Sequence, residues 1–260
     1  MTTQTMYGGQ LDLSTTTRPP MSRLVKVELR KMVDTRAGMW LMIAIGVITV
    51  VAIVIFGLAA SEEDRTFNNF MGFAGTPQGF LLPVMGILLV TQEWSQRTAM
   101  VTFTLEPHRS RTLAAKVYAA LLLGVAAILL AFATAALATV VFGGDNAFDS
   151  FGLIDLAKYG VLQATGVLQG LAFGLLFLNS AAAIVTYFVL PISFSIVAEI
   201  WGWLNERAPW IDLGTAQAPL FEEPGNLSGE QWAQVLVTGL IWVIIPFVVG
   251  LWRMLRAEVK

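Results

Sequence analysis

The chain has 260 residues, of which 56% are apolar and only 13% are charged, and its mean hydropathy is +0.68. Soluble domains carry about 25% charged residues, so this composition excludes a disordered chain, a nucleic-acid-binding protein and an ordinary cytosolic enzyme. The absence of cysteine and the single histidine, His108, exclude a disulfide framework, a Cys-ligated zinc site and most histidine-based catalysis.

A helix is expected before the first membrane span. Residues 1–19 are rich in Thr, Gln and Gly, and we expect them to form a disordered cytoplasmic tail. Two consecutive prolines then suit a helix start. On a helical wheel one half holds Met21, Leu24, Val25, Leu29, Met32 and Val33, and the other half holds Arg23, Lys26, Arg30, Lys31 and Asp34. This pattern is typical of an amphipathic helix in the inner membrane interface, and we expect it to end near Gly38. A simple basic juxtamembrane anchor is the alternative.

Six apolar stretches are long enough to be membrane spans, since about 20 apolar residues cross the hydrocarbon core. In lipid every backbone polar group needs an internal partner, and these stretches lack the alternation of barrel strands. The sequence therefore predicts an all-α integral membrane domain over residues 20–260. The expected spans are about 39–60, 72–92, 113–142, 156–178, 181–203 and 231–252.

The distribution of Lys and Arg predicts the orientation. With both termini in the cytoplasm, 13 of the 16 basic residues fall on the inner side, and only Arg65, Lys158 and Arg207 fall outside. The formal net charge of −2 thus divides into a basic inner side and an acidic outer side. Residues 93–112 then form the main cytoplasmic segment, and residues 205–230 form the longest outer loop, which has room for a short interfacial helix.

The cytoplasmic segment is the most informative part of the chain. Residues 93–116 read EWSQRTAMVTFTLEPHRSRTLAAK. Pro107 interrupts any helix, and Thr112 is a candidate N-cap for the helix of the third span. Glu93, at the end of the second span, is expected to pair with Arg30 or Lys31. An ordinary loop rich in basic residues is the alternative interpretation of this segment.

These features resemble the ABC-2-type ABC transporter permeases, the membrane subunits of bacterial ABC exporters. The resemblance rests on VKVELRKMVDTRAGMWL at residues 25–41, on residues 93–116, and on the six-span layout. In this family a Glu at the end of the second span is followed by a small residue and a Thr, a Pro, a basic pair and a Lys. Arg97 replaces that small residue here. The matching positions are Glu93, Thr98, Pro107, Arg109, Arg111 and Lys116.

The resemblance implies a permease subunit of an ATP-driven exporter in the bacterial cytoplasmic membrane, with a drug, an antimicrobial peptide, a lipid or a similar amphiphile as substrate. It also implies a short coupling helix that docks on an ABC ATP-binding subunit, and a homodimer or heterodimer of permeases embedded in membrane lipid. That ATP-binding subunit, and not this chain, would bind ATP and Mg²⁺. The coupling residues that it implies are Glu93, Trp94, Arg97, Thr98, Pro107, Arg109 and Arg111. The amphipathic helix expected at residues 21–34 corresponds to the elbow helix of such permeases, and its residues of interest are Glu28, Arg30 and Lys31.

The residues themselves favour an external energy source if the chain transports anything. No G-x-x-x-x-G-K-[ST] motif is present, so no ATP hydrolysis is expected in this chain. Ion-coupled carriers usually need ionisable residues inside their spans, and only Glu199, near the outer end of the fifth span, qualifies. Glu199 is either an outer gate or an interfacial carboxylate among tryptophans.

Two alternative functions, an intramembrane enzyme and a membrane scaffold, differ in the motifs that they require. An intramembrane enzyme is disfavoured because H-E-x-x-H, G-x-S-x-G and an intramembrane Asp pair are all missing. A non-transporting membrane scaffold or assembly factor needs no such site and stays open. The G-x-x-x-G pair Gly170 and Gly174 is expected to pack helices within the chain. The aromatic residues of the last two spans either line a ligand path or face lipid; they are Tyr187, Phe188, Phe194, Trp242 and Phe247.

Overall fold

The structure is a computed structural model that describes residues 18–144, 147–148, 151–222 and 225–256. Within these ranges the chain is helical and has no strand, so the predicted all-α class is confirmed. Six helical segments are long and apolar enough to cross a membrane. They are α2 (Arg36–Ala59), α3 (Phe67–Ser95), α5 (Arg109–Phe142), α6 (Leu153–Phe177), α7 (Ser180–Ile200) and the continuous run of α11 (Gly229–Gly239), η2 (Leu240–Ile244) and α12 (Ile245–Arg256).

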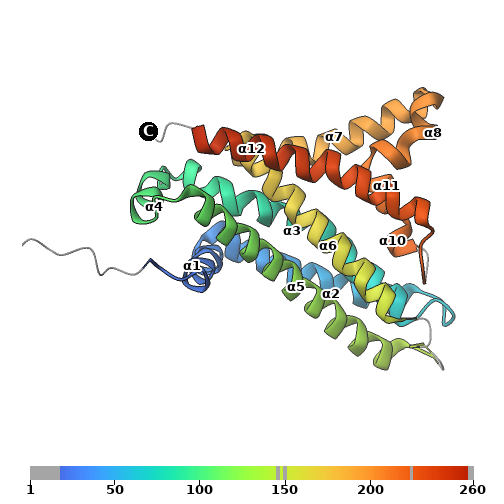
Figure 1. The fold of residues 1–260 in the computed structure, drawn as a ribbon. Coiled ribbons are helices and arrows are strands. Elements are labelled where there is room, and N and C mark those ends of the chain that lie inside the picture. Colours follow the sequence, from blue (N-terminus) through green and yellow to red (C-terminus); the bar gives the residue numbers. More distant parts are fainter. Residues whose placement is uncertain (1–17, 145–146, 149–150, 223–224, 257–260) are drawn as a thin grey trace, which may run out of the picture.

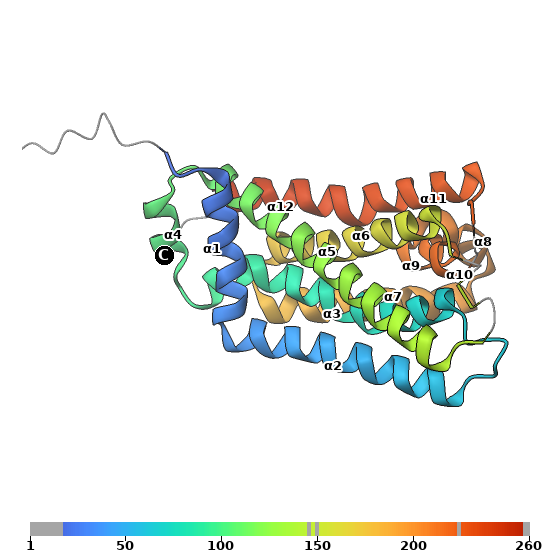
Figure 2. The ribbon, with the colours of Figure 1, turned by 90° about the horizontal axis from the view of Figure 1, so that it is seen from below.

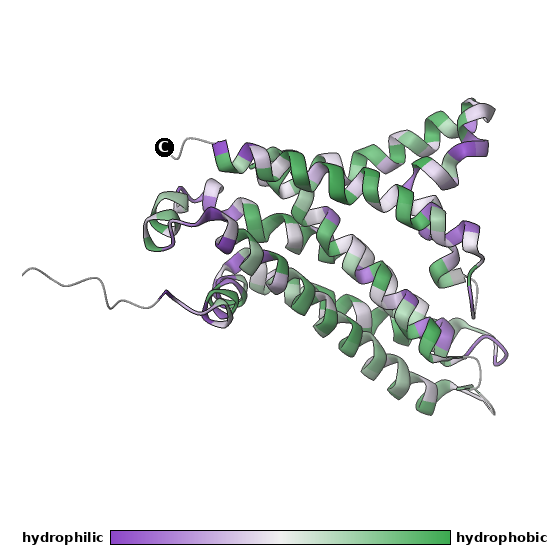
Figure 3. Cartoon of the chain, viewed as in Figure 1, coloured by the Kyte–Doolittle hydropathy of each residue, from purple (hydrophilic) through white to green (hydrophobic). Residues whose placement is uncertain are grey.

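The six long helices coincide with the six predicted spans to within a few residues at each end. The predicted tail, 1–19, lies outside the described residues apart from its last two. Polar residues gather at the two ends of the bundle, and apolar residues fill the length between them (Figure 3).

The short helices mark the two ends of the bundle. Helix α1 (Met21–Asp34) runs crosswise to the long helices (Figure 2), at the end of the bundle that also carries α4 (Ala99–Leu105) and the last turn of α12. We call this the α1 end. The opposite end, which we call the α8 end, carries α8 (Gly202–Ile211), α9 (Leu213–Gln217) and α10 (Pro219–Glu222), so the long outer loop predicted at 205–230 is largely helical. Towards the α8 end, α7 and α11 diverge from α2 and α5 (Figure 1).

The helical conformation is interrupted at Thr35, between α1 and α2. This position is three residues before Gly38, where the amphipathic helix was predicted to end. Thr35 has an extended backbone (φ −86°, ψ 138°), which ends α1. Its hydroxyl accepts a hydrogen bond from the backbone N–H of Gly38 at 3.3 Å and so caps the start of α2. A Cβ on Gly38 would overlap the carbonyl oxygen of Met32, so this tight corner requires glycine.

Helices α3 and α6 form the centre of the bundle through close contacts at glycine. A Cβ on Gly170 would overlap the carbonyl group of Pro83, and one on Gly86 would overlap the backbone of α6. Gly174 lies against Ile87 in the same contact. Small residues let helix backbones approach in a membrane, so the G-x-x-x-G pair does pack helices within the chain, as predicted.

The α3–α6 contact makes a prediction about stability. Gly170→Ala should lower the free energy of unfolding by about 1–3 kcal/mol, because the added methyl group forces the two backbones apart. Gly160→Ala is the matched control on the same helix, since a Cβ there meets nothing within 4 Å. Unfolding in mixed detergent micelles measures both variants. Equal stability of the two would contradict the close approach of α3 and α6.

Candidate functional site

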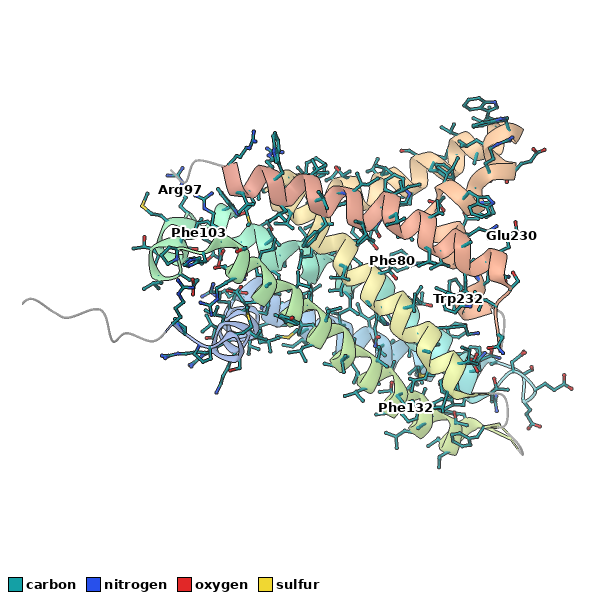
Figure 4. All side chains as sticks on the ribbon, viewed as in Figure 1. Phe80, Arg97, Phe103, Phe132, Glu230 and Trp232 are labelled. Atoms are coloured by element: carbon teal, nitrogen blue, oxygen red, sulfur yellow. The ribbon has the colours of Figure 1, made fainter. Side chains whose placement is uncertain are left out.

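The α1 end brings together four segments that are distant in the sequence: α1, the last turn of α3, α4 and the first turns of α5. Helix α1, the end of α3 and the start of α5 each carry at least one charged residue that the sequence had singled out, whereas α4 itself has none. Arg97 and Phe103, which lie in this region, are labelled in Figure 4. A cavity of about 630 Å³ lies between α1 and α4 and is bordered by residues of all four segments.

Two carboxylates and two ammonium groups form a buried cluster between α1, α3 and α5. We call Glu28, Lys31, Glu93 and Lys116 the four-charge cluster. Lys31 Nζ lies 2.6 Å from Glu93 Oε1 and 2.8 Å from Glu28 Oε1. Lys116 Nζ lies 2.6 Å from Glu28 Oε2 and 3.2 Å from Glu93 Oε1. Lys116 also donates to the carbonyl oxygen of Leu89 at 2.8 Å. Each cation therefore bridges both anions.

Burial makes these contacts matter for stability. Glu28, Glu93 and Lys116 are each only 3% exposed, and Lys31 is half-buried at the edge. Charges in such a site must be paired, because an isolated buried ion loses its hydration without compensation. Two positive and two negative groups cancel, so the site is neutral as a whole. Removal of any one member leaves an uncompensated charge.

The Lys31 ammonium remains protonated at physiological pH. Burial alone would lower its pKa, but the neighbouring carboxylates of Glu28 and Glu93 outweigh burial and raise the pKa above its usual value of 10.5. A cation with a raised pKa contributes stability that is fully present below the unfolded pKa. This contribution is therefore constant through neutral pH and is lost only as the pH rises above about 10.5.

Glu93 also fixes the start of α4. Its Oε1 accepts a hydrogen bond from the hydroxyl of Thr102 at 3.2 Å, and its carbonyl oxygen accepts one from the backbone N–H of Thr98 at 2.9 Å. Between them Arg97 adopts a left-handed conformation with φ 57°. The left-handed region favours glycine, which has no Cβ, so Arg97 occupies a position where a side chain has a conformational cost.

The start of α5 differs from the prediction. Thr112 is not the N-cap: α5 begins at Arg109, His108 occupies the cap position, and no side chain caps the helix. The hydroxyl of Thr112 is instead buried without a hydrogen-bond partner. The helix starts earlier because Glu106 accepts at this turn from the backbone N–H of His108 at 3.4 Å and from Arg111 Nη1 at 3.1 Å.

Two arginines join this turn to both ends of the described chain. Arg111 Nη2 donates to the carbonyl oxygen of Pro19 at 2.6 Å. Arg109 Nη1 donates to the carbonyl oxygens of Met254 at 2.8 Å and Leu255 at 3.2 Å, in the last turn of α12. The guanidinium of Arg109 also lies 4.8 Å from the ring centre of Phe103 on α4. These bonds tie α4 and α5 to the beginning and the end of the bundle.

Helix α4 exposes apolar side chains at an end of the bundle that is otherwise polar. Met100, Val101 and Leu105 are all exposed, and Leu105 is 78% exposed. Figure 3 shows α4 as an apolar segment among hydrophilic ones. On its inner side Phe103 lies 6.4 Å from Trp94, between ring centres, and so packs α4 against the end of α3. A single exposed apolar residue is ordinary, whereas a group on a protruding helix marks a contact surface.

The structure brings together most, but not all, of the residues singled out in the sequence. Of the two expected partners of Glu93, Lys31 makes the pair, whereas Arg30 lies on the exposed face of α1 and pairs with Asp34 at 3.2 Å. Glu199 is exposed near the opposite end of the bundle, in α7, and takes no part in the site.

Two sets of residues were missed by the sequence analysis. Lys116 was noted in the motif but not assigned to the site, although it contacts both carboxylates of the cluster. At the α8 end, Lys158 Nζ lies 2.9 Å from Asp155 Oδ1, and both side chains are buried. A basic and an acidic residue three positions apart at the start of an apolar span was the signal for this second pair.

No protein-family model and no curated protein sequence matches this chain.

The four-charge cluster predicts unequal effects on stability for two substitutions, each of which removes the cation of an ion pair with a carboxylate on α1. Lys116→Met should lower the free energy of unfolding by about 3–5 kcal/mol, because Glu28 and Glu93 keep their charge in a buried site. Arg30→Met removes the exposed pair with Asp34 and should change it by less than about 1 kcal/mol. Denaturant titration of the purified chain in detergent measures both. Similar stability of the two variants would show that the cluster does not hold α1 to the bundle.

Proposed function

We propose that the chain is the membrane-spanning permease subunit of an ATP-driven ABC transporter, an exporter of a drug, an antimicrobial peptide, a lipid or a similar amphiphile. The proposal combines the resemblance of residues 93–116 to ABC-2-type permeases with the geometry of the α1 end. In this proposal α4 is the coupling helix that docks on an ABC ATP-binding subunit, which binds ATP and Mg²⁺.

The observation that carries the proposal is that α4 exposes apolar side chains and is held firmly to the neighbouring helices. The exposed side chains of α4 offer a soluble partner an apolar contact, and charge-depleted apolar patches are typical of interface cores. Glu93 contacts α4 through Thr102, α1 through Lys31 and α5 through Lys116. A push on α4 is therefore transmitted to three helices and is not absorbed by a loose loop.

The proposed orientation follows from charge. The α1 end carries most of the basic residues of the chain, so the positive-inside rule assigns it to the cytoplasm of a bacterial cell. Helix α1 then lies in the inner membrane interface, where the exposed apolar residue Val33 meets lipid. A second permease copy, identical or homologous, completes the transporter. The alternative remains a membrane scaffold that binds a partner through α4 without transport.

A charge on the exposed face of α4 should break the coupling. Leu105→Glu should reduce at least tenfold the amount of ATP-binding subunit that co-purifies with the chain from its native cells, because burial of an unpaired charge in an apolar contact costs more than about 1.4 kcal/mol. Leu153→Glu is the matched control, since Leu153 is 86% exposed at the α8 end, far from a partner docked on α4. Quantitative mass spectrometry of the purified complexes measures the ratio.

The ATPase activity of the reconstituted complex separates the two functions. A transporter predicts that ATP turnover of the partner changes when the wild-type chain is added and that Leu105→Glu removes this change. Turnover that is identical with and without the chain would favour the scaffold. If no P-loop ATPase accompanies the wild-type chain, the transporter proposal is wrong.

A further inference from the structure

A cavity of about 500 Å³ lies towards the α8 end of the bundle, between α3, α6, α7, α9 and η2. Pockets that hold small organic ligands have volumes of about 300–1,000 Å³. The segments that enclose this cavity come from distant parts of the sequence, and one of its wall residues, Phe80, is labelled in Figure 4. The cavity is separate from the α1 end and shares none of the residues of the four-charge cluster.

Aromatic rings form much of the wall. Phe188 and Phe80 are stacked with ring centres 6.4 Å apart, and Tyr187 meets Phe188 edge to face at 5.1 Å. Trp242, from η2, also lines the cavity, and its indole N–H donates to the carbonyl oxygen of Ile211 at 2.6 Å. Of the aromatic residues singled out in the sequence, Tyr187, Phe188 and Trp242 line the cavity. Phe194 does not line it, and Phe247 packs against the main hydrophobic core. Faces of such rings attract organic cations.

The described residues that line the cavity carry negative charge only. None of the described lining residues is Lys or Arg, and Asp212 is the one carboxylate among them. Asp212 caps α9: its Oδ2 accepts from the backbone N–H and the hydroxyl of Thr215, each at 2.8 Å. Its Oδ1 takes no hydrogen bond from any described residue. One carboxylate oxygen therefore remains available at the mouth of the cavity.

A buried donor also lacks a partner. Tyr159 lines the cavity, its side chain is buried, and no described residue accepts a hydrogen bond from its hydroxyl. An unsatisfied buried hydroxyl costs about 1–3 kcal/mol, so a ligand that accepts this bond gains free energy. The glutamines Gln163 and Gln217 add polar groups to an otherwise apolar wall.

We propose that this cavity binds an amphiphilic organic cation, with its aromatic or apolar body against Phe80, Tyr187 and Phe188 and its positive charge towards Asp212. Anionic amphiphiles do not fit, because no cation lines the wall and Asp212 repels them. The role of the cavity as a cargo site rests on the proposed transport function. Binding of the cation depends only on the geometry of the cavity.

Tetraphenylphosphonium is the probe, because tetraphenylborate has nearly the same shape and the opposite charge. The purified chain is placed in nanodiscs of uncharged phosphatidylcholine, and equilibrium dialysis measures radiolabelled tetraphenylphosphonium bound in excess of empty nanodiscs. We expect saturable binding of about one cation per chain. Tetraphenylborate is dialysed in a separate experiment, because the two ions pair with each other in water, and it should show no saturable binding in excess of empty nanodiscs.

Three variants locate the site. Asp212→Asn should weaken binding about tenfold, because the attraction between charges is lost, while Asn keeps the cap of α9 intact. Phe188→Leu should weaken it about threefold, because one cation–ring contact is lost. Glu199→Gln removes a carboxylate that is exposed near the same end and does not line the cavity, and should leave binding unchanged.

Several results would overturn the proposal: no binding above empty nanodiscs, equal loss for Asp212→Asn and Glu199→Gln, or saturable binding of tetraphenylborate. Gel filtration and the melting temperature confirm that each variant is folded. The assay needs neither ATP nor an ATPase, so a chain that binds the cation but no ATPase refutes only the coupling, and the reverse result refutes only the cavity.

Discussion

Two carboxylates and two ammonium groups, buried together and neutral as a set, hold the α1 end of this protein together. Glu28 reaches the cluster from α1, Glu93 from α3 and Lys116 from α5, so three helices that hydrophobic packing alone would leave free to slide are fixed in register. In a low-dielectric site every member needs the others. The crosswise position of α1 and the turn into α4 both depend on this arrangement.

The two halves of the bundle differ in how closely their helices approach. Glycines on α3 and α6 allow backbone contact near the middle of the bundle, with Gly170 against Pro83. Towards the α8 end the helices diverge (Figure 1), and larger side chains such as Tyr187 and Phe188 surround space instead of filling it. Close backbone packing at the centre of the bundle and buried ion pairs at the α1 end hold the fold together. The α8 end can therefore contain a cavity.

The spans were predictable because bilayer thickness and backbone hydrogen bonding leave few alternatives for an uncharged run of 20 residues. The Glu93–Lys31 pair was also predictable, since Glu93 ends a span and Lys31 lies on the amphipathic helix expected at the same end. The part played by Lys116 was not, because its depth depends on how α5 packs against α1 and α3. The cavity was beyond reach for the same reason: Asp212 lies between α8 and α9, and only the folded chain brings it beside rings from α7.

The hydrogen bonds from Arg109 to the last carbonyl oxygens of α12 have a consequence for biosynthesis. The ribosome delivers Arg109 145 residues before Met254. Until the last helix is made, this guanidinium lacks its acceptors on α12, and α6 lacks the helix that packs against it. Insertion of the last span is therefore the event that locks the middle of the sequence, and a chain that stalls before it should present a degradation-prone surface to the quality-control proteases of the membrane.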